Sequence, residues 1–156
     1  MIIEYFREKN MSDLFYKNFY SDLENEIRKK YTNGNLRKNH KHGNQFGLDF
    51  GIKAVSNDYR TRLNRNPGVK IHIVVDSKKE NSAFFDYLVQ NINAIESKVG
   101  LNLEYNDDNN RYKQIYFDYL IDLNEEDNRK VALDYVSSKA ILLMEEVLKL
   151  HSQFSP

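Results

Sequence analysis

The residues from Gly68 to Asp76 constrain the fold more than any other part of the sequence. Lys70 and His72 alternate there with four apolar residues, Val69, Ile71, Ile73 and Val75. A period of two is typical of a β-strand with one buried face. The strand therefore needs helices on its apolar face, while its other face carries basic groups that a core does not require.

Three segments have the apolar spacing of amphipathic helices, at residues 12–31, 81–100 and 124–153. In each segment apolar residues recur every three or four positions and line one side of the helix. Gly100 is expected to end the second helix, and Asn124, a common cap residue, is expected to begin the third. These helices can cover a sheet built around the central strand.

The other strands are predicted on both sides of the central strand. Alternating patterns at residues 46–54 and 59–63, separated by a turn at 56–58, precede it, and strands at 101–105 and 111–121 follow the second helix. The predicted fold is α+β, with an antiparallel sheet and helices packed on one of its faces. The expected order is helix-strand-strand-strand-helix-strand-strand-helix.

The segment at about residues 32–45 is polar and basic, with little apolar material with which to fold. We predict a mobile basic loop there, within a single domain of residues 1–156. A loop of this length is either a functional site or a solvated connector, and the sequence does not separate these two interpretations.

Charge is distributed unevenly along a chain whose formal net charge is zero. Between Arg28 and Val75 the sequence holds eleven basic residues and only two acidic ones, Asp49 and Asp58. Acidic residues predominate in the rest of the chain. A surface with this asymmetry can steer a polyanion or the acidic patch of another protein.

The basic side chains of neighbouring strands would share one face of such a sheet. Arg forks onto phosphate, and several contacts of this kind give salt-dependent nucleic-acid binding. Phe46 and Tyr59 are candidates for stacking on unpaired bases. The alternative is that long basic side chains only cover a solvent-facing sheet. We favour a binding protein over an enzyme, one that engages nucleic acid or a nucleoprotein complex without a cofactor, through Arg37, Lys38, Lys41, Lys53, Arg60, Arg62, Arg65, Lys70 and His72.

A metal-dependent nuclease is the alternative from enzyme chemistry. Asp76 and Lys78 form an Asp-x-Lys pattern at the end of the central strand, and Asp49 precedes it on an outward position. Two carboxylates can hold Mg²⁺ while a lysine stands near the attacking water. The element order also resembles the PD-(D/E)xK nuclease core, although no Pro-Asp precedes a hairpin. An ordinary turn at the end of a strand explains the same residues.

Other chemistry has little support in the sequence. The absence of cysteine excludes disulfides and thiolate metal sites, and it favours a cytoplasmic protein. His40 and His42 lack a third ligand at a convincing spacing, so no metal site is predicted. No apolar run approaches the length that spans a membrane, so no membrane partner is expected.

The second half of the chain resembles an uncharacterised bacterial domain. That domain occurs alone or at the C-terminal end of restriction-endonuclease-like, defence-associated proteins. The resemblance covers mainly residues 69–154 and implies a role in prokaryotic defence or phage counter-defence, for example as an inhibitor of a CRISPR or restriction system. The residues that carry it are Phe85, Leu88, Ile95, Glu96, Gly100, Leu101, Leu103, Tyr105, Arg111 and Ile115.

A third hypothesis is a dimeric protein similar to secretion chaperones, which bind a segment of an effector. The element order fits that fold, whereas the strong basic block differs from the acidic character of such chaperones. Leu142 and Met144 lie off the main apolar stripe of the third helix. This helix could therefore contact a second subunit, and a homodimer through it is compatible with any of these functions.

Overall fold

An antiparallel sheet of six strands forms the centre of the protein in a computed structural model. The structure describes residues 2–32, 34–79, 82–108 and 111–155, with side chains from residue 11 onward except at 79. The strands lie in the order β1-β2-β3-β4-β6-β5. Their bounds are Arg37–His42 (β1), Gln45–Asp49 (β2), Val55–Arg62 (β3), Gly68–Asp76 (β4), Glu104–Asn106 (β5) and Tyr112–Leu120 (β6). The helices are α1 (Ile2–Lys30), α2 (Ser82–Gln90), α3 (Ile92–Val99) and α4 (Glu126–Gln153), and a short 3-10 turn, η1, spans Ser77–Lys79.

The central strand is confirmed with the predicted bounds, and β4 pairs along its whole length with β3 and with β6. Val69, Ile71, Ile73 and Val75 are fully buried, and Lys70 and His72 point to the other face. The same alternation in β6 buries Ile115 and Phe117 on the apolar face. The sheet therefore has one covered face and one open face.

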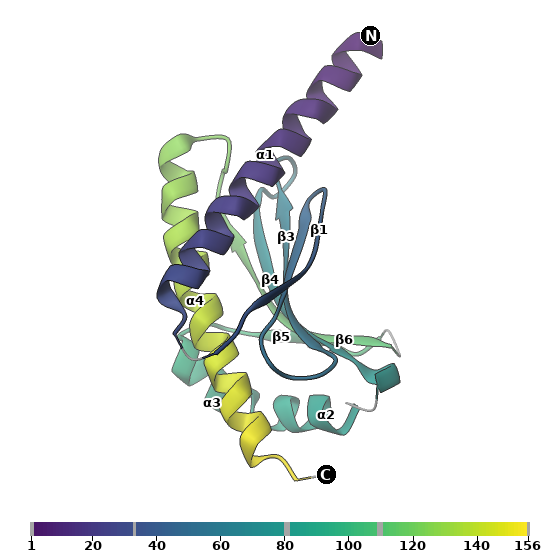
Figure 1. Cartoon of the computed structure of the whole chain (residues 1–156), viewed down its shortest axis with the longest axis vertical. Coiled ribbons are helices and arrows are strands. Elements are labelled where there is room, and N and C mark those ends of the chain that lie inside the picture. The colour runs from purple at the N-terminus through teal and green to yellow at the C-terminus, as the bar shows by residue number, and fades with distance from the viewer. Residues whose placement is uncertain (1, 33, 80–81, 109–110, 156) are drawn as a thin grey trace.

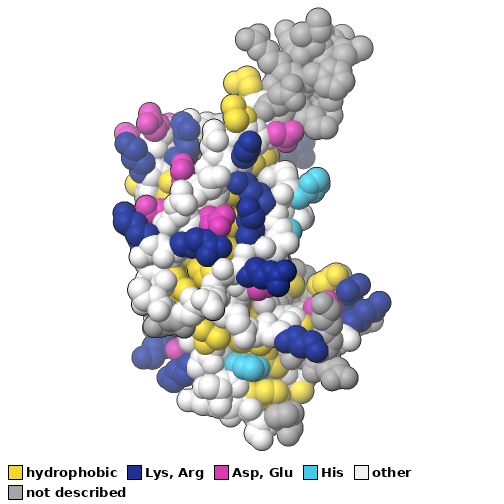
Figure 2. All heavy atoms as spheres, viewed as in Figure 1, with side chains coloured by type: hydrophobic (Ala, Val, Ile, Leu, Met, Phe, Trp, Pro, Cys, Tyr) yellow, Lys and Arg dark blue, Asp and Glu magenta, His cyan; other side chains and the backbone are white. Residues whose placement is uncertain are grey.

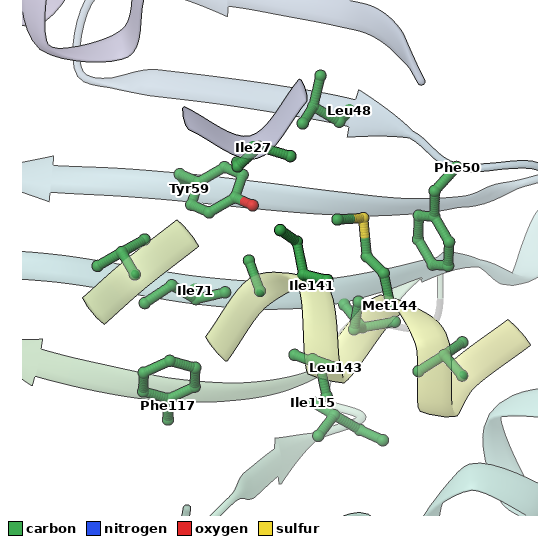
Figure 3. Close-up of a cluster of buried hydrophobic side chains, with 14 of the residues drawn as sticks. Ile27, Leu48, Phe50, Tyr59, Ile71, Ile115, Phe117, Ile141, Leu143 and Met144 are labelled. Atoms are coloured by element: carbon green, nitrogen blue, oxygen red, sulfur yellow. The ribbon is translucent and has the colours of Figure 1, made fainter. Parts of the chain in front are cut away.

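Helices α1 and α4 lie side by side and cover the apolar face of the sheet (Figure 1). Ile27 of α1 and Met144 of α4 are buried against side chains of the strands. Figure 3 shows how these helical side chains meet Leu48, Tyr59, Ile71, Ile115 and Phe117 from four strands. Burying this much apolar surface is the dominant stabilising contribution to the fold.

The segment expected to be a loop contains an edge strand. Residues 37–42 form β1, which pairs with β2 through a hairpin closed by Gly43 and Asn44, with a register shift between Lys38 and His40. Backbone hydrogen bonds to one neighbour hold this strand, so it has no need of the apolar alternation used for the prediction. A Gly-Asn pair between two short strands is itself a hairpin signal.

The turn predicted at residues 56–58 is wrong, because these residues lie within β3. The side chains of Asn57 and Thr61 are fully buried on the apolar face beside Tyr59, so the inner side of the strand is partly polar in the sequence. Asn57 is satisfied there, since its amide donates to the carbonyl of His72 at 3.0 Å and its oxygen accepts from the Tyr59 hydroxyl.

The helix predicted at residues 81–100 is divided into α2 and α3 at Asn91. The Asn91 side chain donates to the carbonyl of Tyr87 at 2.8 Å, so it competes with the backbone ladder at this point. Gly100 ends α3 as predicted, in the left-handed conformation and with its N–H donating to Glu96 at 2.8 Å. Helix α4 begins two residues after Asn124.

The α+β class and the antiparallel sheet are confirmed, and the predicted element order is wrong by one strand and one helix. Leu142 is 41% exposed on α4, whereas Met144 is buried in the core. A homodimer through this helix stays a prediction. In the described part of the chain no helix is both long and apolar enough to cross a membrane.

Candidate functional site

The open face of the sheet is hollowed into a depression of about 970 Å³, which extends from β1 across β2, β3 and β4 to β6. Alternate residues of these strands form its floor, because every second side chain points away from the helices. Exposed side chains of β1, β3 and the segment between β2 and β3 form its rim. We call this depression the hollow.

Five of the nine predicted binding residues line the hollow. Arg37 on β1 and Arg60 on β3 are exposed, and neither has a carboxylate within ion-pair distance among the residues that the structure describes. Burial lowers the pKa of Lys70, which stands 4.0 Å above the ring of Tyr116. The five residues are Arg37, Lys53, Arg60, Lys70 and His72.

The other four predicted residues lie away from the hollow. Arg62 reaches Asp118, and one of its guanidinium nitrogens contacts both carboxylate oxygens, at 2.7 and 2.9 Å. Lys38 and Lys41 lie opposite buried residues of β2 in the strand register, so their side chains point to the helical face of the sheet. Lys41 donates there to Ser21 of α1 at 2.9 Å. Arg65 is exposed in the turn between β3 and β4.

The basic block of the sequence is therefore divided between two sides of the molecule. At the end of α1, Arg28 pairs with Glu24 at 2.9 Å and Lys30 pairs with Asp134 of α4 at 2.9 Å. Figure 2 shows basic and acidic side chains interspersed over α1 and α4. Charge on this side is locally compensated, whereas Arg37 and Arg60 on the open face have no carboxylate partner within the described ranges.

A polar cluster lies over Gly47 on the floor of the hollow. His40, Gly47 and Asp58 are directly opposite one another on β1, β2 and β3. A Cβ atom at position 47 would lie 2.3 Å from Asn39 Oδ1, 2.5 Å from His40 Cε1 and 2.6 Å from Asp58 Oδ1. Only glycine leaves room for these three side chains to converge, and Asn39 in turn donates to Asp49 at 2.8 Å.

Asp58 is the least satisfied group in this cluster. Its Oδ1 atom is buried and has no hydrogen-bond partner among the described residues. Burial raises the pKa of Asp58, and the nearby His40 and a hydrogen bond with Ser56 oppose that effect. A buried acceptor without a donor costs about 1–3 kcal/mol, so the fold retains this carboxyl at a cost.

The neighbouring strands hold a polar network whose members are paired. The Nδ1 atom of His72 pairs with Oε1 of Gln114, and the hydroxyl of Tyr116 donates to Glu104 at 2.9 Å. Burial lowers the pKa of His72 to about 4, although Gln114 partly opposes this effect. His72 is consequently neutral near pH 7 and adds no positive charge to the hollow.

The candidate nuclease residues do not form a metal centre. Asp49 and Asp76 both line the hollow, but β3 lies between their strands and Asp76 is two residues beyond the position opposite Asp49, which places their backbones roughly 12 Å apart. Asp76 accepts from Arg111 at 3.3 and 3.4 Å and from the backbone N–H of Lys78 at 3.2 Å. Throughout the described ranges, no three carboxylate or histidine side chains gather as a metal would require. Whether Mg²⁺ acts in this protein stays untested.

The two aromatic residues predicted to stack on bases, Phe46 and Tyr59, are buried in the core and cannot contact a base. Tyr112 lines the hollow instead and is 44% exposed, with the Arg111 guanidinium 4.8 Å from its ring centre. An aromatic side chain at the rim therefore exists, but it belongs to β6.

The cluster over Gly47 is not evident from the sequence as a site. The sequence pattern puts Asp58 in a turn and His40 in a loop, because their strands lack a clean apolar alternation. The signals that point to the cluster are the Gly43–Asn44 hairpin and the polar period of two from Ser56 through Asp58 to Arg60. Together these signals put Gly47 between His40 and Asp58.

A family model described as a domain of unknown function, DUF4268, matches residues 15–151. The chain belongs to the DUF4268 family. No curated protein and no solved structure matches the chain. The DUF4268 match includes every residue that lines the hollow, so the candidate site lies inside the family's domain. The association of this family with restriction-endonuclease-like proteins stays a prediction.

Proposed function

We propose that the open face of the sheet binds nucleic acid, either alone or within a nucleoprotein complex. The observation that carries this proposal is the position of Arg37 and Arg60 on the rim of the hollow, both exposed and without a carboxylate partner among the described residues. A guanidinium group in this state is available to form a two-pronged contact with phosphate.

Lys53 and Lys70 line the same hollow from two further elements. The four cations thus surround one depression, and each phosphate that they contact releases counterions from the nucleic acid. Tyr112 adds an exposed ring on which a base can stack, a contact worth about 1–3 kcal/mol. Binding of this kind is salt-dependent and only weakly selective for sequence.

The hollow also contains Asp49, Asp58 and Asp76, which are not expected in a surface that binds polyanions by charge alone. Asp76 is paired with Arg111, Asp49 accepts from Asn39, and burial raises the pKa of Asp58. The carboxyls thus lie on the floor and the cations at the rim, with Asp49 directly opposite Arg37, while the partners of Asp49 and Asp76 and the burial of Asp58 weaken the negative potential. A nucleotide, with an anionic phosphate and a base rich in hydrogen-bonding groups, matches this division.

The resemblance to a domain of defence-associated proteins suggests the process in which such binding takes place. A protein of this kind would contact the nucleic acid of a restriction or CRISPR complex, as part of prokaryotic defence or of phage counter-defence. Neither role requires a reaction at the hollow.

The test is a charge reversal on each side of the molecule. Arg60→Glu removes an unpaired cation from the rim, and Lys130→Glu reverses an exposed charge on α4 as the matched control. Fluorescence anisotropy with a labelled single strand of about 12 nucleotides reports the affinity. We expect Arg60→Glu to weaken binding about tenfold or more and to reduce the slope of log Kd against log salt by about 1.

Arg60 is exposed and makes no ion pair with a described residue, so the reversal should leave the circular dichroism spectrum and melting temperature close to those of the wild type. Equal losses of affinity in the two variants would show that net charge, and not the hollow, determines binding. No detectable binding by the wild type at low salt would refute the proposed function.

A further inference from the structure

We propose that the hollow takes one unpaired base and that Asp58 selects bases with an exocyclic amino group over thymine and uracil. This inference depends on the proposed function and adds to it the form of the ligand and the residue that reads it. Three features lead to it: the depth of the hollow, the state of the Asp58 carboxyl and the freedom of His40 to rotate.

The hollow has a basic rim and a polar floor. Arg37, Lys53 and Arg60 are exposed at its edge, whereas Asp58 and His72 are largely buried below them. Its volume of about 970 Å³ lies in the range of sites that enclose a small molecule. A duplex presents its phosphates on a convex surface and keeps its bases stacked, so only an unpaired base can enter while its phosphate stays at the rim.

Asp58 supplies an acceptor that nothing in the described structure satisfies. Its Oδ1 atom converges with Asn39 Oδ1 and His40 Cε1 on the space over Gly47, so the two nearest polar atoms at this point are both acceptors. A ligand that brings an N–H group to Oδ1 would remove the cost of the unpaired oxygen.

The bases differ in this respect. Adenine, cytosine and guanine each carry an amino group with two N–H bonds, whereas thymine and uracil offer only the N3–H group, which lies between two carbonyl oxygens. An amino group can donate to Oδ1 of Asp58 and to Oδ1 of Asn39 together, whereas N3–H satisfies only one of these acceptors and brings a carbonyl oxygen toward the other. The selection therefore excludes thymine and uracil and tolerates the other three bases.

His40 covers Asp58 in the free protein and can move aside. The imidazole is half-buried and forms no hydrogen bond within the described ranges, and it belongs to the edge strand β1. Packing over Gly47 and the electrostatic interaction with Asp58 hold it in place. Rotation of this side chain exposes Oδ1 to the incoming base without disturbing the core.

The experiment compares three labelled homopolymers of about 12 nucleotides, oligo(dA), oligo(dC) and oligo(dT), by fluorescence anisotropy at one salt concentration. For the wild-type protein we expect oligo(dA) and oligo(dC) to bind about tenfold more tightly than oligo(dT), the value of one hydrogen bond to a charged group. The duplex formed by annealing oligo(dA) with oligo(dT) should bind no more tightly than oligo(dT) alone, since the amino groups of adenine are then paired.

Asp58→Asn is the decisive variant. The amide keeps the shape of the side chain, but its NH₂ group can donate to the thymine carbonyl, so the preference against oligo(dT) should shrink to about threefold or less. Because Oδ1 of this buried carboxyl has no partner among the described residues, its replacement by an amide is expected to give a folded variant. Asp86→Asn, the same change on an exposed residue of α2 outside the hollow, is the control and should retain the preference.

The outcomes separate this inference from the proposed function. Equal binding of the three homopolymers by the wild type, or an unchanged preference in Asp58→Asn, overturns the inference and leaves nucleic-acid binding in place. Loss of all binding in Arg60→Glu together with equal affinities in the wild type also overturns the inference alone. Failure of every oligonucleotide to bind the wild-type protein overturns both.

Discussion

The two halves of the open face contain similar residues in different states. In the β4–β6 half, His72 pairs with Gln114, and the ring of Tyr116 lies beneath Lys70. In the β1–β3 half, Arg37 and Arg60 have no carboxylate partner within the described structure, and Oδ1 of Asp58 is unpaired. Asn39 and Asp49 also pair in the β1–β3 half, but the polar groups there are satisfied less completely than those of the β4–β6 half.

Under the proposed function, this difference separates residues that stabilise the sheet from residues that are available to a ligand. A fully paired network stabilises and orders the residues within it. Unpaired groups close to such a network are costly, and their persistence is typical of sites that a ligand completes. Under the proposed function, the paired half supports the site and the unpaired half provides the surface that the nucleic acid contacts.

Glycine substitutions should give the largest effects and should differ between the two halves. A Cβ atom on Gly68, in the first position of β4, would lie 2.2 Å from the carbonyl oxygen of Tyr119, a backbone atom that cannot move away. We expect Gly68→Ala to lower the free energy of unfolding by about 3 kcal/mol or more. Gly47→Ala meets only the ends of side chains and should cost about 1–2 kcal/mol.

Urea denaturation monitored by circular dichroism measures both changes. Gly47→Ala should in addition impair oligonucleotide binding, because the new methyl group displaces His40 and Asp58 from the floor of the hollow. Equal costs for the two substitutions would indicate that the β1–β3 half is as tightly packed as the β4–β6 half.

The pH dependence of stability should reveal the buried histidine of the paired half. Burial lowers the pKa of His72 to about 4, while the unfolded chain binds the same proton near the ordinary histidine pKa of 6.5. Below pH 6.5 the unfolded state binds a proton at His72 that the native state does not bind until about pH 4. The free energy of unfolding therefore falls as the pH drops from 6.5 to 4. The loss attributable to His72 should approach roughly 2–3 kcal/mol at the acidic end.

His72→Asn is the matched variant, because asparagine can hydrogen-bond to Gln114 but does not titrate. The difference in unfolding free energy between wild type and variant should change across this pH window and stay constant above it. Lys70, Arg60 and Asp118 act on His72 only through the histidine charge, which the variant lacks, so the comparison isolates that proton. Parallel pH profiles would contradict the assignment.

The sequence predicts the covered face better than the open one, for a physical reason. Burial imposes a period on apolar residues, and β4, with four buried apolar residues, can be assigned with its correct bounds. Strand β3 buries Asn57 and Thr61 beside Tyr59, which obscures its period and displaces Asp58 into a predicted turn. The polar cluster over Gly47 is lost with it.

The charge pattern of the sequence shows which residues are basic, but it does not show where their side chains lie or which carboxylates they meet. Arg60 and Arg62 are two residues apart on the same strand, and the sequence predicts that both bind a partner. The structure pairs Arg62 with Asp118 of β6, which is remote in sequence, and leaves Arg60 without a carboxylate partner among the described residues. Which cation is neutralised depends on strand order, and the adjacency of β4 and β6 cannot be inferred from spacing alone.

These two arginines give the smallest expected effect and the most direct test of the comparison. Arg62 donates from Nε to the carbonyl of Asn66 at 2.9 Å as well as to Asp118, so Arg62→Ala removes a tie across the β3–β4 turn. The ion pair is partly exposed, with side-chain exposures of 25% for Arg62 and 39% for Asp118, and solvent weakens it. We expect Arg62→Ala to cost about 1 kcal/mol of unfolding free energy and Arg60→Ala less than about 0.5 kcal/mol.

Oligonucleotide affinity should follow the reverse order. A phosphate can contact Arg60 without displacing another group, whereas it would have to break the existing ion pair of Arg62. If both variants instead lose stability and affinity in the same proportion, the distinction between paired and unpaired cations has no functional meaning in this protein.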